Sequence, residues 1–143
     1  MDKHEHLKVV IKGETINLCK PTLKFAKHSK WYSWLNDRFI IRNLSKIYQK
    51  SKNTKEKQAK FFLRESKKRI ILIISTKNKI YKGVISLSSL DNQKKQCGIA
   101  IITDVSIESH IAPYAALEAM ALMTEYAFNK LKMKKVYGQG NLE

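Results

Sequence analysis

Three apolar segments between residues 69 and 104 constrain the fold of this 143-residue chain more than any other feature. RIILIIST is a continuous run of mostly β-branched residues, which is typical of a strand buried on both faces. IYKGVISLSSLD and QCGIAIITD are also largely apolar, and short polar turns join the three segments. Strands connected by such short turns form an antiparallel meander. Gly83, inside the second segment, predicts a bulge or a close approach of two backbones.

The segments before this meander predict a hairpin followed by two helices. LKVVIKGETINLCKPT has a turn signal at Lys12-Gly13 between two short strands, and Pro21 ends the second strand. Residues 24–37 and 55–68 have helical patterns, the second with Thr54 as its N-cap. The side chains expected to face inward are Phe25, His28, Trp31 or Tyr32, and Leu35 in the first helix, and Ala59, Phe62 and Leu63 in the second.

The last part of the chain predicts a long helix and a short strand. The helix should begin near Pro113, because the missing N–H of a proline costs nothing in a first helical turn. The expected inward stripe consists of Leu117, Met120, Ala121, Thr124, Phe128 and Leu131. VYGQGN predicts a strand, so the passage over 97–137 implies a right-handed parallel crossover. With no repeat or linker, residues 1–143 predict one α/β (α+β) domain with a twisted, mostly antiparallel sheet.

The net charge of +16 has three possible origins. One is a nucleic-acid partner. A second is an anionic small ligand such as a nucleotide cofactor, and a third is a general use of lysine, since lysines occur in nearly every segment. Arginine is the usual reader of bases and phosphates, yet the chain has only Arg38, Arg42, Arg64 and Arg69. Nucleic acid is therefore the least favoured partner.

The cysteines and histidines give no sign of a disulfide framework or a metal site. Cys19 and Cys97 are too few and too far apart for a framework, and the four histidines form no metal-ligand spacing with them. No apolar run reaches the ~18 residues that a membrane span needs. The first residues, MDKHEHLK, lack the apolar core of a secretory signal. We therefore expect a cytoplasmic protein with no membrane partner.

Six stretches of the chain, taken in order, resemble the GCN5-related N-acetyltransferase (GNAT) superfamily. They are VVIKGETINLCKPT, WYSWLND, EKQAKFFL, KGVISLSSLD, CGIAIITD and EAMALMTEYAFNKLKMKKVYGQGN. The closest branch acetylates ribosomal-protein N-termini, amino sugars or small amines. No single stretch is diagnostic, but their order and spacing are more specific and cover most of the chain. The resemblance implies a GNAT-like sheet with helices on both faces, and acetyl-CoA as co-substrate.

The resemblance also places acetyl-CoA against the third meander strand and the helix that follows it. It assigns the backbone of Ile101, Ile102 and Thr103 to the pantetheine arm. It assigns the pyrophosphate to a loop and helix start made of His110, Ile111, Ala112, Pro113, Tyr114, Ala115 and Ala116. A helix N-terminus offers unpaired amide donors and the positive end of its dipole to an anion.

This loop departs from the family pattern of Arg or Gln, two residues, Gly, one residue, and Gly or Ala. Ile111 takes the first position, Tyr114 takes that of the first glycine, and only Ala116 conforms. Glycines let a backbone approach a phosphate closely. Two alternatives follow: the chain binds acetyl-CoA in an altered or weaker way, or it is a non-catalytic relative that no longer binds it.

The acceptor side is implied to include Trp31, Trp34, Asn36 and Asp37. Core packing is the alternative for the tryptophans, and a helix end is the alternative for the Asn-Asp pair. The acceptor would be a primary amine on an amino sugar, a protein N-terminus or a small molecule. Many relatives carry a glutamate near the place of Gln96, which cannot act as a base. Asp104 and Glu118 are nearby acids with structural explanations, so we assign no catalytic residue.

The sequence ends at NLE, directly after the last expected strand. Relatives continue there with another helix and a β-hairpin that complete the sheet. The resemblance therefore implies that the C-terminal helix and hairpin are missing and that one end of the sheet is uncovered. We expect either a truncated chain or a partner subunit, such as a second copy in a homo-oligomer, over that edge.

Overall fold

A six-stranded sheet forms the centre of the protein. The computed structural model describes residues 6–34, 53–104 and 113–138, and the strands follow one another across the sheet in chain order. They are β1 (Lys8–Lys12), β2 (Ile16–Lys20), β3 (Ile70–Thr76), β4 (Tyr81–Asp91), β5 (Gln96–Thr103) and β6 (Lys135–Gly138). Neighbours pair antiparallel except β5 and β6, which are parallel. The predicted meander and the parallel crossover are confirmed.

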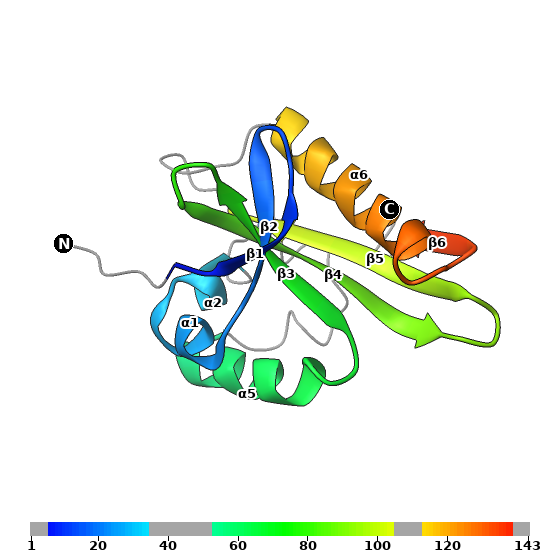
Figure 1. Cartoon of the computed structure of the whole chain (residues 1–143). Coiled ribbons are helices and arrows are strands. Elements are labelled where there is room, and N and C mark those ends of the chain that lie inside the picture. The colour runs from blue at the N-terminus through cyan, green and yellow to red at the C-terminus, as the bar shows by residue number, and fades with distance from the viewer. Residues whose placement is uncertain (1–5, 35–52, 105–112, 139–143) are drawn as a thin grey trace.

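Helices cover both faces of this sheet, as expected (Figure 1). Helix α6 (Pro113–Asn129) lies on one face, and α1 (Leu23–His28), α2 (Trp31–Trp34) and α5 (Lys55–Glu65) lie on the other. Side chains of β3 alternate between the two cores that result. Leu72 and Ile74 belong to the core under α6, whereas Ile71 and Ile73 belong to the core under the other helices. β3 is therefore buried on both faces, as its sequence predicts.

The single helix predicted over 24–37 is wrong within the described residues, which hold two short helices instead; residues 35–37 lie outside them. Ser29 ends α1 with an extended backbone, and its hydroxyl accepts a hydrogen bond of 3.2 Å from the amide of Trp31. Serine favours such local bonds at helix ends over a helix interior. The break leaves His28 exposed, contrary to expectation, while Phe25 and Trp31 are buried.

Helix α5 begins as predicted, and of its three expected inward side chains Ala59 is buried and Phe62 packs against the core, whereas Leu63 does not. The Thr54 hydroxyl accepts from the amide of Lys57 at 3.1 Å, which makes it the N-cap. Ala59 is buried, but Leu63 is 53% exposed, so its inward placement was wrong. Gln58 is buried instead, and its Oε1 accepts from Nδ2 of Asn53 at 2.9 Å. A satisfied hydrogen bond explains the buried polar side chain.

Helix α6 begins at Pro113, as predicted. The predicted inward stripe is right only for Met120 and Leu131, which are partly buried against the core under this helix. Its buried residues are Ala115, Ala119, Met123 and Ala127, which recur every four positions. Leu117 is 72% exposed and Phe128 is 40% exposed. Small side chains let this helix lie close to the sheet. Because α6 is apolar over most of its surface, its periodicity did not identify the face that packs.

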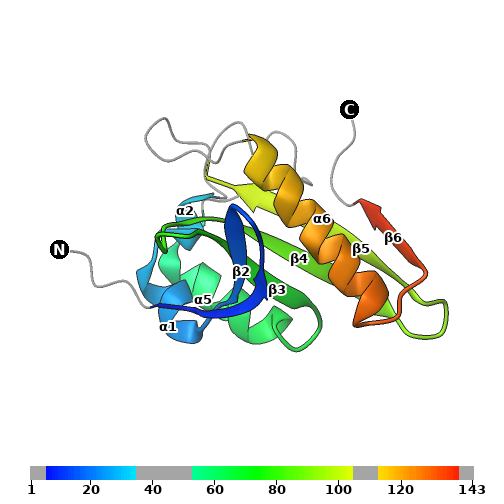
Figure 2. The same cartoon turned by 45° about the horizontal axis from the view of Figure 1, so that its top comes forward.

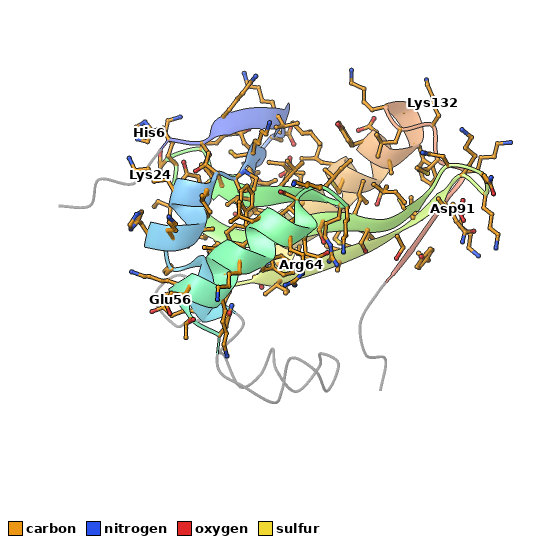
Figure 3. The ribbon with its side chains drawn as sticks, turned by 90° about the horizontal axis from the view of Figure 1, so that it is seen from below. His6, Lys24, Glu56, Arg64, Asp91 and Lys132 are labelled. Carbon is orange, nitrogen blue, oxygen red and sulfur yellow. The ribbon has the colours of Figure 1, made fainter. Side chains whose placement is uncertain are left out.

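Positive charge is spread over the described surface. Lys24 on α1, Arg64 on α5 and Lys132 after α6 all point outward from different elements (Figure 3). Glu65 pairs with two arginines on or just after its own helix, at 2.7 and 2.9 Å. This distribution agrees better with a general use of lysine than with one basic patch for a duplex.

Candidate functional site

The second half of β5 has one open edge among the residues that the structure describes. β6 pairs with β5 only over residues 96–99, and its last partner pair is Gly138 with Ile99. Residues 100–103 continue past this point and pair with β4 alone. In Figure 2, β6 runs beside the part of β5 nearest the β4–β5 turn. An open strand edge presents N–H and C=O groups to an extended ligand.

The first turns of α6 lie at the same end of the sheet as this open edge. The strand register shows this step by step. Ile16, at the β1–β2 turn, pairs with Thr76 at the end of β3, and Ser75 beside it pairs with Tyr81 at the start of β4. Gly83 in turn pairs with Thr103, so the β1–β2 turn and the last residue of β5 lie at the same end of the sheet. From α6, Glu118 reaches that β1–β2 turn. The first turn of α6 contains no acidic residue. Its amides and dipole therefore favour an anion at this end.

The structure places only some of the implied phosphate-loop residues. Tyr114 is 65% exposed, Ala115 is buried against the sheet and Ala116 is half-buried. His110, Ile111 and Ala112 lie outside the described residues. Pro113 occupies the first helical position and has no N–H to offer. The helix start thus keeps amide donors at the three residues that follow it.

Ile101, Ile102 and Thr103 all lie on the part of β5 with the open edge and are partly buried. The Ile101 side chain packs toward the α6 core, and that of Ile102 packs toward the core that contains Trp34. The side chains are therefore anchored in two cores while the outer backbone edge stays unpaired by any described strand. Such anchoring restricts how far the backbone of this edge can move.

The two tryptophans implied on the acceptor side are buried in the core under α1, α2 and α5. Trp31 is 2% and Trp34 is 3% exposed. The Trp31 ring centre lies 5.9 Å from that of Phe25 and 6.2 Å from that of Phe62. Nε1 of Trp34 is buried and has no hydrogen-bond partner in the described part of the chain. Asn36 and Asp37 fall outside the described residues.

Asp104 ties the connection between α1 and α2 to the end of β5. Its carboxylate lies 2.8 Å from Nζ of Lys30, and its side chain is only 7% exposed. Its amide donates to the carbonyl of Lys82 at 2.7 Å. This pair was missed by sequence reasoning, because the two residues are far apart in the chain and each has an ordinary local context. It brings the helices of one face against the open part of β5.

Glu118 holds the β1–β2 turn. Its carboxylate accepts hydrogen bonds from the amides of Glu14 and Thr15 and from the Thr15 hydroxyl. Burial raises the pKa of this carboxyl, but the bonds from Thr15 and Glu14, with Lys77 nearby, outweigh burial and hold the pKa below its ordinary value. Gln96, by contrast, pairs with Lys135 at the far end of β5 from Thr103.

We expect Glu118→Gln to lower the free energy of unfolding by about 1 kcal/mol near neutral pH, because the amides lose a charged acceptor. The folded-state pKa of Glu118 is below the unfolded value of about 4.3. Its contribution is therefore full above that value and is lost as the pH falls through the folded pKa. Urea denaturation of both proteins near pH 7 and near pH 3 should show a difference that shrinks in acid. A constant difference would contradict the assignment.

Within residues 6–34, 53–104 and 113–138, no group of three or more His, Cys, Asp or Glu residues is placed to hold a metal ion. No helix in the described part is long and apolar enough to cross a membrane. Cys19 and Cys97 are both buried free thiols, and burial raises the pKa of each.

Solved acetyltransferases have the same fold. No family model and no curated protein matches the sequence. The microcin C7 self-immunity acetyltransferase MccE, in complex with acetyl-CoA and AMP, superposes with a TM-score of 0.64 at 20% identity, covering 85% of this chain and 66% of that one. The spermidine N-acetyltransferase of Vibrio cholerae, with CoA and spermine, gives 0.69 at 12% identity, covering 87% and 70%.

A dodecameric structure of the Vibrio cholerae spermidine N-acetyltransferase gives a TM-score of 0.64 at 13% identity, covering 87% of this chain and 68% of that one. The chain thus spans about two thirds of the length of the acetyltransferases it matches, 66% for MccE. These likenesses show the fold, and they confirm the GNAT-like arrangement of sheet and helices expected from the sequence.

Proposed function

We propose that the protein transfers an acetyl group from acetyl-CoA to a primary amine. The observation that carries this proposal is the open outer edge of β5 over residues 100–103, at the same end of the sheet as the acid-free start of α6. One element offers backbone hydrogen bonds to an extended arm, and the other offers amides to a pyrophosphate. The shared fold with acetyltransferases that bind acetyl-CoA or CoA supports it.

In this proposal the backbone of Ile101, Ile102 and Thr103 pairs with the pantetheine arm. The amides of Tyr114, Ala115 and Ala116 meet the pyrophosphate, together with residues 110–112. Acetyl-CoA would supply an activated acyl group, so the chain needs to do little chemistry beyond orientation. Backbone N–H groups on the β5 edge would polarise the thioester carbonyl. We assign no side chain as general base or acid.

The acceptor we propose is an amine on an anionic or neutral scaffold, such as an amino sugar linked to a nucleotide or a protein N-terminus. A net charge of +16 repels a polycation and attracts an anion at long range. In this proposal Trp34 lies near the amine that is acetylated; its buried indole N–H is a hydrogen-bond donor with no partner among the described residues. A second copy covering the outer edge of β6 is part of the same proposal.

The decisive test is calorimetric titration of the protein with acetyl-CoA at two salt concentrations, with duplex DNA as the comparison ligand. We expect saturable one-site binding of acetyl-CoA that survives the higher salt. We also expect thiol release when an amino sugar or a peptide amine is added. DNA binding, if present, should weaken steeply as salt increases. A folded sample that gives no heat with acetyl-CoA would instead favour the non-catalytic alternative.

A further inference from the structure

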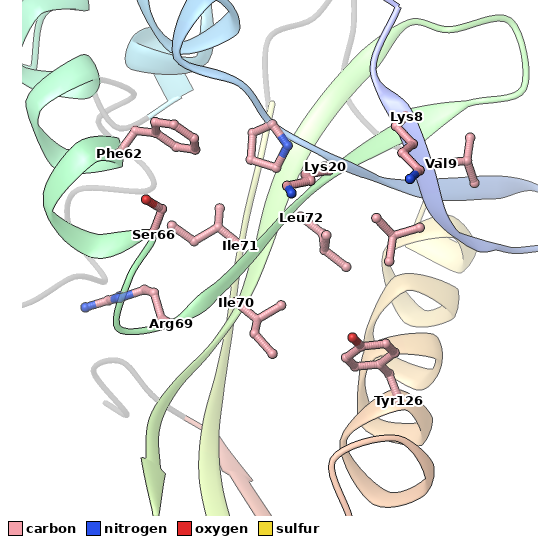
Figure 4. Close-up of a pocket in the computed structure, with 12 residues that line it drawn as sticks. Lys8, Val9, Lys20, Phe62, Ser66, Arg69, Ile70, Ile71, Leu72 and Tyr126 are labelled. Carbon is pink, nitrogen blue, oxygen red and sulfur yellow. The ribbon is translucent and has the colours of Figure 1, made fainter.

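A cavity opens where β2 leaves β3, on the side of β3 that faces away from β4. β2 pairs with β3 from Ile16 opposite Thr76 to Cys19 opposite Ile73, so residues 70–72 extend past the last pair. The cavity there has a volume of 740 Å³ (Figure 4). Typical small-molecule pockets measure about 300–1,000 Å³. β4 and β5 separate it from the open edge proposed for acetyl-CoA.

The cavity has an apolar interior and a cationic rim. Its apolar walls include Val9, Val10, Phe62, Ile70 and Leu72. Lys8, Lys20 and Arg69 bring positive charge to it, and none of the twelve described residues that line it is acidic. The phenol of Tyr126 on α6 closes another side. This combination suits a ligand with an apolar body and a single anionic group.

Lys8 and Lys20 stand directly opposite each other on β1 and β2. Neither side-chain ammonium group has an ion-pair or hydrogen-bond partner in the described ranges. Like charges directly opposite on neighbouring strands weaken a sheet, and an anion held between these two exposed lysines would remove that repulsion. Arg69 differs, because its Nη2 lies 2.9 Å from Oε1 of Glu65. Among the residues that the structure describes, the two lysines are thus the cations of this rim that no acidic side chain compensates.

We propose that this cavity binds an organic monocarboxylate with an aliphatic body. The carboxylate lies between the ammonium groups of Lys8 and Lys20, where charge-assisted hydrogen bonds replace like-charge repulsion. The aliphatic body lies along residues 70–72 of β3 and displaces water from the apolar walls. Inorganic phosphate would pair with the two lysines but would not displace water from the apolar walls. A polycation would be repelled by the rim.

The proposal can be tested with the full chain labelled with ¹⁵N and titrated with octanoate, using octylammonium and inorganic phosphate as comparison ligands. We expect saturable amide shift changes confined to the residues that line the cavity, among them 8–10, 20, 62, 69–72 and 126, and much weaker changes with either comparison ligand. The double variant Lys8→Gln/Lys20→Gln should weaken octanoate binding by about tenfold or more, since both charged partners are lost. Octanoate is the probe and stands for the ligand class.

Lys12→Gln is the matched control, because Lys12 is an exposed lysine on the same strand that does not line the cavity. It should bind octanoate like the wild type. The double variant should melt no lower than the wild type without octanoate, since it loses a like-charge pair, so its loss of binding cannot come from unfolding. Three results would overturn the proposal. Octylammonium could bind as tightly as octanoate, or the cavity amides could stay unshifted at millimolar octanoate. The third is that an acidic peptide binds and octanoate does not.

Discussion

Gly83→Ala should destabilise the protein by about 2 kcal/mol, because the added methyl group has no room between β4 and β5. A Cβ at this position would lie 2.8 Å from the carbonyl oxygen of Ile102 and 3.1 Å from Cα of Thr103. Both neighbours are backbone atoms, so β5 itself would have to move. The sequence predicted a bulge or a close backbone approach at Gly83. The structure shows both, because the register between β3 and β4 also shifts where Ile74 pairs with Gly83 and Ser75 with Tyr81. Urea denaturation monitored by circular dichroism measures the loss.

Gly138→Ala provides the control for this prediction. A Cβ at Gly138 in β6 would have no atom of the described residues within 4 Å. The same chemical change should therefore range from no effect to about 0.5 kcal/mol of stabilisation, through a less flexible unfolded chain. If the two variants lost equal stability, the cost would come from replacing a strand glycine in general and not from crowding between β4 and β5.

Ala116→Asp should weaken acetyl-CoA binding by about 100-fold or more while leaving the fold intact. The proposed pyrophosphate site lies at the first turn of α6, and a carboxylate there would repel the phosphates. Ala116 is half-buried and an acidic residue in a first turn is favoured by the helix dipole, so the change in stability should stay within about 0.5 kcal/mol. Calorimetric titration and a thermal melt separate the two effects.

Ala121→Asp adds the same charge to the same helix at an exposed position away from the first turn. It should bind acetyl-CoA nearly as well as the wild type. If both variants bound equally weakly, the loss would reflect the total charge of the protein. If Ala116→Asp bound normally, the phosphate site would not be at the start of α6, even if acetyl-CoA binding itself were established.

The strands could be predicted well because each carries its own signal. The apolar run RIILIIST must be buried on both faces of the sheet, independently of the other segments. The turns on either side of β4 are too short for a crossover, so β3, β4 and β5 can pair only antiparallel. The face of α6 could not be predicted in the same way. Leu117 and Phe128 are as apolar as Met123, and only the close approach of Ala115, Ala119 and Ala127 to the sheet decides between them.

Only those parts of the candidate site that have a local sequence signal could be predicted. Pro113 identified the start of α6, and the apolar stretch CGIAIITD identified β5. The ion pair between Lys30 and Asp104 could not be predicted, since it depends on how two distant segments meet. The same holds for the opposed Lys8 and Lys20, whose pairing depends on the register after an irregularity between Val9 and Ile11.

The alternation of β3 between two cores has a consequence for how the molecule opens. Neither α6 nor the group of α1, α2 and α5 can detach without exposing one set of β3 side chains to water. If either helical layer detaches, β3 loses the packing on that face, and the other helical layer then packs against a less firmly held strand. Partial opening on one face should be short-lived, and the two faces should unfold as one cooperative unit.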